Sequence, residues 1–389
     1  MTEKLTAVSV FILILSSSLA HSKDIYKNEH IEFSLSGTYK NLYTISETIL
    51  KEDFRSDLNR LRLEFDVKLK DSIFIKTILD NEALLGSILG TEWFLRTKEI
   101  EEDTFFDLNN NVIDNTDLFW SQSLYRMYLS YSTEKINLTA GRQRVTWGTG
   151  RIWNPIDLFN SVSPLKLESG ERTGVDAVHV EYFVGSLSYV SFVYAPGKES
   201  FKTSVASRVK TNLKGYDLSL VLGEFRRDQV LGFDFAGSIG DSGFRGEVTF
   251  TDPEDGKDFT RFLLSWDYTF TNSLFMLFEY LYNGGNINSE NFGRFIDTAN
   301  LTIFTGEIVT RNKHFLGSVV GYDITHLLRG NILIIYDIDG GSVFAGPAIN
   351  YNVMSNVDWT IGGQIFSGSK SSEFGELSDA VYTSIKWYF

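Results

Sequence analysis

The chain has 389 residues, a net charge of −14, no cysteine and only 5 prolines, with 14% aromatic and 22% charged residues. The lack of cysteine excludes disulfides, thiolate metal sites, iron–sulfur clusters and covalent haem attachment to this chain, and the acidic balance argues against a nucleic-acid partner. This composition fits a β-barrel with one face toward lipid and one toward water better than a bundle of membrane helices.

The first twenty residues have the pattern of a secretory signal peptide. Lys4 supplies a short charged region, the stretch from Leu5 to Leu15 is mostly apolar, and Ser18-Leu19-Ala20 is a small-x-small cleavage site. The apolar run is too short to span a bilayer well. We therefore expect residues 1–20 to be removed and residues 21–389 to form a single domain.

Apolar residues recur at every second position along most of the remaining chain. In residues 60–69, leucine, phenylalanine and valine alternate with charged residues, as in a strand with one apolar face. A count of 16 strands stays open, because residues 201–211 and 228–239 alternate less clearly. The pattern predicts an all-β, transmembrane, antiparallel up-and-down β-barrel of about 18 strands near residues 31–45, 57–70, 72–82, 121–132, 135–146, 174–184, 186–196, 201–211, 214–226, 228–239, 242–251, 258–270, 272–283, 312–324, 327–338, 341–352, 356–368 and 378–389.

The connections between these strands alternate in length. Every second connection is only one or two residues long, and the others include long ones at residues 83–120, 147–173, 284–311 and 369–377. Short turns at one end and long loops at the other are typical of a porin-like barrel, with the turns on the periplasmic side. With 18 strands, both termini fall on the short-turn side.

The last strand ends at the last residue of the chain. Val381, Ile385, Trp387 and Phe389 share one face of it. A terminal strand ending in phenylalanine resembles the C-terminal signal of bacterial outer-membrane barrels. The resemblance implies the outer membrane of a Gram-negative bacterium, contact with membrane lipid and lipopolysaccharide, and recognition by the barrel-assembly machinery through the Phe389 strand.

The long connection after residue 146 is the segment most suggestive of function. Strict alternation would place Arg142 and Arg144 in hydrocarbon, at a cost of roughly 2–4 kcal/mol each near the bilayer centre. A bulge at Gly141 would turn both side chains into the lumen instead. Trp147 and Trp153 are too apolar for a loop in water. We therefore predict that residues 146–165 fold into the barrel and narrow it.

Short motifs in this segment resemble those of a known group of barrels. A Gly-Arg-Gln strand followed by Trp-Gly-x-Gly and Asn-Pro-x-Asp is similar to porin-like barrels of Gram-negative bacteria, including families near the alginate-export barrels. In such families an inward-folded loop narrows the pore, and arginines on the wall form a selective track. The resemblance implies a constriction here, lined by Trp147, Arg151, Trp153 and Asp157.

The charges that alternation directs into the lumen are of both signs. They permit two interpretations, a basic track that favours anions or ion pairs that fill and stiffen the wall. The basic residues expected near the constriction come from early strands, and acidic residues such as Glu64, Asp66, Glu247 and Glu279 are interleaved with basic ones. The set that we single out is Arg60, Arg62, Arg126, Arg142 and Arg144.

The most economical hypothesis is a passive outer-membrane channel for small hydrophilic solutes. Its selectivity would arise from the width left by residues 146–165 and from the field of Arg126, Arg142, Arg144 and Arg151. Two alternatives are an exporter of an anionic exopolysaccharide and a barrel sheath for a periplasmic multihaem electron conduit. No catalytic, metal-binding or cofactor-binding pattern is recognisable, so an enzyme is not expected; an oligomer is compatible with the sequence.

Overall fold

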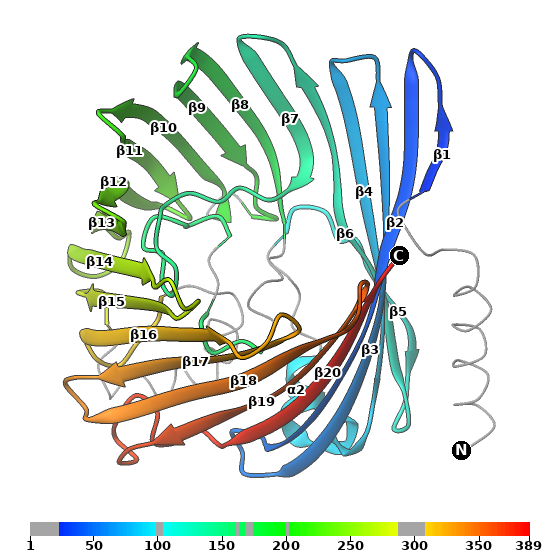
Figure 1. Cartoon of the computed structure of the whole chain (residues 1–389), viewed down its shortest axis with the longest axis vertical. Coiled ribbons are helices and arrows are strands. Elements are labelled where there is room, and N and C mark those ends of the chain that lie inside the picture. Colours follow the sequence, from blue (N-terminus) through cyan, green and yellow to red (C-terminus); the bar gives the residue numbers. More distant parts are fainter. Residues whose placement is uncertain (1–22, 99–103, 161–162, 168–173, 200–201, 287–307) are drawn as a thin grey trace.

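The computed structural model describes residues 23–98, 104–160, 163–167, 174–199, 202–286 and 308–389. Within these residues, 20 strands form one sheet. Eighteen of them, β2–β4 and β6–β20, follow one another as an antiparallel ring that closes where β20 pairs with β2. Figure 1 shows this closed barrel in a view through its interior. The predicted signal peptide lies outside the described residues.

The strands agree closely with the alternation in the sequence. Each of the eighteen predicted strands corresponds to one barrel strand, and the ends differ by at most four residues. The predicted fold and the count of 18 are therefore confirmed. The barrel strands are β2 (Ile31–Glu47), β3 (Asp53–Leu69), β4 (Ile73–Leu85), β6 (Phe119–Ser132), β7 (Ile136–Gln143), β8 (Val175–Gly185), β9 (Ser188–Ala195), β10 (Ser204–Leu213), β11 (Tyr216–Phe225), β12 (Asp228–Ile239), β13 (Ser242–Asp252), β14 (Phe259–Thr269), β15 (Phe275–Asn283), β16 (His314–Asp323), β17 (Leu328–Asp337), β18 (Ser342–Met354), β19 (Val357–Ser367) and β20 (Ala380–Tyr388).

Two short strands that the sequence analysis missed cover edges of the sheet. β1 (Lys23–Lys27) pairs with the start of β2 at residues 32–35, which precede residues 38–46 that pair with β20. β5 (Asn109–Asp114) pairs with residues 119–123 of β6, which precede residues 127–132 that pair with the short β7. An unpaired edge exposes backbone hydrogen-bonding groups, so both strands satisfy groups that their neighbours leave open. The 3-10 helix η1 (Ser87–Gly90) and the helix α2 (Glu92–Thr97) precede β5.

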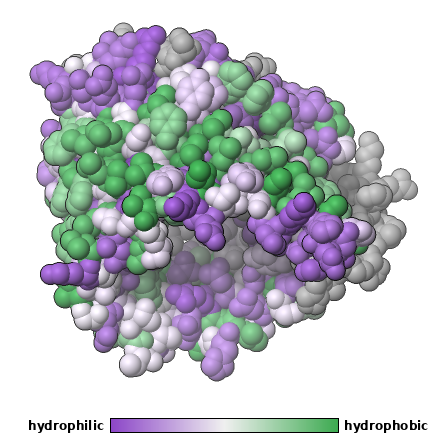
Figure 2. All heavy atoms as spheres, turned by 90° about the horizontal axis from the view of Figure 1, so that it is seen from above, coloured by the Kyte–Doolittle hydropathy of each residue, from purple (hydrophilic) through white to green (hydrophobic). Residues whose placement is uncertain are grey.

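The two faces of each strand differ in exposure as the alternation predicts. On β14, Phe262 and Leu264 are 38% and 37% exposed on the outer face, whereas Leu263 between them is fully buried inside. Figure 2 shows hydrophobic residues gathered across one side of the barrel, with hydrophilic residues toward its margins. Such an apolar outer surface suits contact with lipid. Among the described residues, no helix is long and apolar enough to cross a membrane.

The C-terminal residue closes the ring against Gly37. The Gly37 N–H donates to the Phe389 carbonyl at 2.7 Å, and the Phe389 N–H donates to the Gly37 carbonyl at 3.0 Å. The Phe389 ring is 8% exposed and contacts Trp387, with ring centroids 4.7 Å apart. A Cβ atom on Gly37 would lie 2.6 Å from the Phe389 ring. The phenylalanine therefore occupies space that only glycine leaves free.

Candidate functional site

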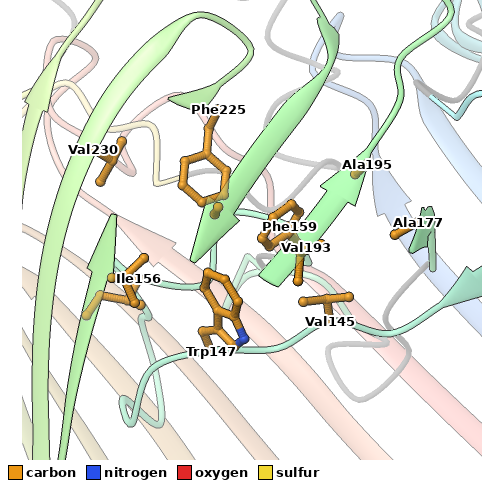
Figure 3. Close-up of a cluster of buried hydrophobic side chains, with 11 residues drawn as sticks. Val145, Trp147, Ile156, Phe159, Ala177, Val193, Ala195, Phe225 and Val230 are labelled. Atoms are coloured by element: carbon orange, nitrogen blue, oxygen red, sulfur yellow. The ribbon is translucent and has the colours of Figure 1, made fainter. Parts of the chain in front are cut away.

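After β7 the chain leaves the wall and enters the barrel. We call residues 144–167 of this connection the inward segment, of which residues 144–160 and 163–167 are described. Trp147 and Phe159 are 4% and 9% exposed and meet edge to face, with centroids 5.3 Å apart. Phe159 also contacts Phe225 of β11 at 4.9 Å. Figure 3 shows these side chains packed with Val193 of β9 and Val230 of β12.

The inward segment then continues along the inner wall to the far side of the barrel. Ile152 and Trp153 pack in a second cluster with Leu263, Leu281 and Phe315 from β14, β15 and β16. Further along, the Leu165 carbonyl accepts a hydrogen bond of 2.7 Å from the Gln364 side chain on β19. The segment therefore follows the inner wall from β7 to β19, as its path inside the ring in Figure 1 indicates.

Two wall glutamates hold the backbone of this segment. Glu247 on β13 and Glu279 on β15 are 2% and 1% exposed. Each carboxylate accepts three hydrogen bonds from backbone N–H groups of residues 149–156. The donors to Glu247 are the N–H groups of Thr149, Gly150 (2.6 Å) and Ile156 (3.1 Å), and the donors to Glu279 are those of Arg151 (2.6 Å), Ile152 (2.8 Å) and Trp153 (3.2 Å).

The inward segment has a buried side and an exposed side. Val145 and Trp147 are buried against the wall, while Arg144 and Thr146 between them are exposed, as is Arg151 further on. Since the segment lies inside the barrel and packs its buried side chains on the wall, the exposed ones face the remaining interior. Arg144 and Arg151 thus border the open space.

Three residues predicted to line the constriction are buried instead. Trp147 and Trp153 face the wall, at 4% and 5% exposed. Asp157 is fully buried and accepts a hydrogen bond of 3.3 Å from the Asn160 N–H within the segment itself. These side chains hold the segment in place, whereas Arg144 and Arg151 determine the charge that it presents.

The wall that the segment leaves uncovered carries a row of basic side chains. Lys386 of β20 is the cross-strand partner of Lys40 on β2, which is the partner of Arg60 on β3. This row lies on the face opposite Val381 and Ile385, which are 61% and 46% exposed on the outside. Like charges in direct cross-strand contact destabilise a sheet unless other groups compensate them.

Acidic residues on β4 pair with the arginines of β3. The Arg60 Nε lies 2.5 Å from a Glu82 oxygen. Arg62 binds Asp80 through two hydrogen bonds of 2.6 Å. These are ion pairs of the kind that the interpretation as a filled, stiffened wall requires. The positive charge of the basic track is therefore partly neutralised by acidic side chains on the same wall.

A bulge on β6 adds an aromatic ring to this side of the lumen. Ile78 pairs with Arg126 and Leu79 pairs with Leu124, so Tyr125 is an extra residue between them. The Arg62 guanidinium lies over the Tyr125 ring, 4.0 Å from its centroid, and that of Arg126 lies 5.2 Å from it. Guanidinium groups are attracted to aromatic faces at these distances, so the bulge links Arg62 and Arg126 in one cluster.

The bulge that we expected at Gly141 is not present. β7 pairs with both neighbours through Gly141 without a register shift, and this glycine has φ 118°. Arg142 is 3% exposed, binds Asp176 at 3.0 Å and donates to the Phe106 carbonyl at 2.5 Å. Glycine alone readily adopts this φ, so the strand turns there without inserting a residue. Arg142 thus anchors the chain before β5.

The ion pair of Arg62 with Asp80 gives a test of the basic track. In an Asp80→Asn variant, Arg62 loses its acidic partner, so the field at this wall becomes more positive. We expect the reversal potential in a salt gradient to shift toward the equilibrium potential of the anion. The free energy of unfolding should fall by about 1–3 kcal/mol. An Asp71→Asn change in an exposed turn removes the same charge and should leave both quantities unchanged.

The carboxyl group of Glu373 joins two of the long connections. Glu373 lies between β19 and β20 and accepts hydrogen bonds from the backbone N–H groups of Arg311 (2.8 Å) and Asn312 (3.3 Å). Burial raises the pKa of Glu373 from 4.5 to about 7, although these two hydrogen bonds oppose the shift. The folded state therefore binds a proton here more tightly than the unfolded state does.

This shift predicts a pH dependence for the contact between the two connections. A group whose pKa is raised by folding stabilises the folded state at low pH, and this contribution is lost as pH rises from 4.5 through about 7. We expect hydrogen exchange at the Arg311 and Asn312 amides to become faster, relative to intrinsic rates, as pH rises through this interval. A Glu373→Gln variant should lose that dependence; an identical profile in the variant would assign it to another group.

Comparisons with known proteins identify the fold. No protein-family model matches the chain, and no curated protein matches it. Among solved structures, OccAB4 of Acinetobacter baumannii has a TM-score of 0.57 and 11% identity, covering 94% of this chain and 100% of that one. The outer membrane protein OprD of Pseudomonas aeruginosa has a TM-score of 0.57 and 11% identity, covering 95% and 97%. OccD3 (OpdP) of Pseudomonas aeruginosa has a TM-score of 0.55 and 11% identity, covering 95% and 93%.

These similarities establish a shared barrel architecture. The chain is a closed, antiparallel β-barrel of 18 strands with the fold of these solved proteins. The expected porin-like barrel is confirmed at the level of the fold. None of these three structures is an alginate-export barrel, so that part of the resemblance receives no support from them.

Proposed function

We propose that this protein is an outer-membrane channel that passes small hydrophilic solutes and favours anions. The observation that carries the proposal is the division of the barrel interior. The inward segment covers the wall from β8 to β19, and its exposed Arg144 and Arg151 border the space that remains. Across that space lies the wall that carries Lys386, Lys40 and Arg60. Rings of basic side chains favour anions in pores.

The outer-membrane location rests on the architecture and the lipid-compatible exterior. The chain shares its fold with OprD, which is described as an outer membrane protein, and its outer face is rich in exposed aromatic and aliphatic residues. The exposure of Arg144 and Arg151 supports a water-lined route rather than a sealed core. Contacts with lipopolysaccharide and with the barrel-assembly machinery remain predictions.

The inward segment also bears on the two alternatives. A sheath for a multihaem protein needs an interior wide enough for a folded polypeptide, and an exporter of an anionic polymer needs a wide, arginine-lined passage. Here hydrophobic clusters fix residues 145–159 and Leu165 inside the barrel, and the arginines of β3 are paired with acids. Both features favour small solutes over either macromolecule.

Exchange of the exposed arginines tests the proposed anion preference. In an Arg144→Ser, Arg151→Ser double variant, the field of the segment is weakened without loss of its buried contacts. We expect the ratio of anion to cation permeability, from reversal potentials across planar bilayers in a salt gradient, to fall roughly twofold or more.

The matched control is Arg96→Ser, which removes an arginine from the exposed helix α2 at the exterior end of the barrel. This variant should keep the permeability ratio of the parent. An unchanged ratio in the double variant, measured on folded protein, would show that the inward segment does not select ions.

A further inference from the structure

We propose that Glu247 and Glu279 are positioning residues that set the anion preference of the pore by holding residues 149–156 against the wall. This inference rests on the proposed channel function. The two carboxylates lie on β13 and β15, with β14 between them. Their negative charge by itself would repel anions, yet we predict that their presence increases the preference of the pore for anions.

The backbone geometry shows a cradle built around these carboxylates. Residues 149–156 possess seven backbone N–H groups, because Pro155 has none, and six of them donate to Glu247 or Glu279. Hydrogen bonds from N–H groups to a charged carboxylate are roughly twice as strong as those between neutral groups. The segment is thus attached by its main chain as well as by its buried side chains.

The glycines of the Trp-Gly-x-Gly motif allow the chain to curl this closely. Gly148 has φ 86°, and a Cβ atom there would lie 2.0 Å from the Asn154 side-chain oxygen and 2.7 Å from Glu247 Oε1. A Cβ atom on Gly150 would lie 1.9 Å from the Trp153 carbonyl oxygen. The motif that the sequence analysis singled out therefore has a physical role, which is to wrap backbone donors around wall carboxylates.

The position of Arg151 follows directly from this attachment. Its backbone N–H donates to Glu279 at 2.6 Å, while its side chain is exposed toward the interior. A glutamine at position 279 would keep the shape of the side chain but would lose charge and present an amide N–H₂ group toward backbone donors. Residues 151–153 would then be held less firmly against the wall, and Arg151 would no longer be fixed beside the passage.

The sign of the effect distinguishes positioning from simple electrostatics. If Glu247 and Glu279 acted only through their charge, neutralising them would increase the preference for anions. If they hold the segment, Glu247→Gln and Glu279→Gln should each lower the ratio of anion to cation permeability about twofold and increase fluctuations of the open-channel current. Asp267→Asn on β14 is the matched control: this wall acid pairs with Arg245 at 2.7 Å instead of with the segment, so neutralising it should not lower the ratio.

A chemical measurement tests the attachment without any reference to ion flow. The chain has no cysteine, so the thiol of an Ile152→Cys variant is a unique label at a position that is 9% exposed. We expect a water-soluble thiol reagent to react with it at least about tenfold faster when Glu279→Gln is added, since local detachment exposes the site. The Asp267→Asn background should leave the rate unchanged.

The outcomes separate the two proposals. Faster labelling without any anion preference in the parent would support the attachment of the segment by Glu247 and Glu279, and would refute the proposed selectivity. An unchanged labelling rate in the Glu279→Gln variant would overturn the proposed attachment, provided that a strand-type far-UV spectrum shows the barrel to be folded. If neither glutamine variant folds, Gly150→Ala tests the same backbone contacts with both carboxylates retained. This change should accelerate labelling of the cysteine at position 152. An unaltered rate would likewise overturn the proposed attachment.

Discussion

Replacement of residues 146–160 by a short Gly–Ser linker is expected to raise single-channel conductance at least about twofold, because the narrowest cross-section controls ion flow. The change removes the buried aromatic residues and the six backbone hydrogen bonds to Glu247 and Glu279. It leaves every strand pairing of the barrel intact, since β7 and β8 pair outside this stretch. Single-channel recording in planar bilayers provides the measurement.

A linker of the same kind in place of residues 253–258, an exterior connection between β13 and β14, is the control. It should fold and conduct like the parent. If the folded variant without residues 146–160 shows the parent's conductance, the inward segment does not limit the passage, and the proposed constriction is wrong.

A Gly37→Val variant is expected to destabilise the barrel by about 1–3 kcal/mol, the usual cost of overpacking a filled site. The added side chain would meet the Phe389 ring at 2.6 Å and the Arg62 carbonyl at 2.7 Å, where the first and last barrel strands join. Equilibrium unfolding in urea, followed by tryptophan fluorescence, gives the free energy. The yield of folded barrel after refolding should fall with it.

Gly185→Val provides the comparison for this experiment. Gly185 ends β8, and nothing lies within 4 Å of the Cβ atom that a substitution would add. This variant should unfold like the parent. Equal stability of the two variants would mean that contact between Gly37 and Phe389 contributes nothing to closure.

The barrel was predictable from the sequence because its signal is local. In residues 60–69 each apolar side chain has a charged neighbour on both sides, so the two faces can be assigned without knowledge of any other strand. β1 and β5 were missed because they are short edge strands without a full alternating pattern. Both are defined by pairing with β2 and β6, which follow them in the chain after three and four residues.

The site was only partly predictable because its contacts depend on register. The large apolar side chains after Gln143 predicted burial inside the barrel, and Trp147 and Trp153 are buried there. The pairing of Arg62 with Asp80 depends on how β3 is aligned with β4. The bulge lies at Tyr125 because the register of β6 shifts by one residue relative to β4. The positions of glycines in the sequence do not reveal this shift.

Glu247 and Glu279 illustrate the same limit. Alternation placed both carboxylates inside the barrel, but their partners are backbone groups about one hundred residues earlier in the chain. The Trp-Gly-x-Gly motif gave a local hint, since two close glycines permit unusual backbone paths. Only the three-dimensional structure shows which wall residues the backbone of the segment contacts.

The most direct test of the account is single-channel recording of the folded parent protein across a bilayer with a salt gradient. Discrete, stable current steps are expected, with a reversal potential that indicates a preference for anions. Folded protein that inserts yet produces no steps, or steps with a preference for cations, would contradict it.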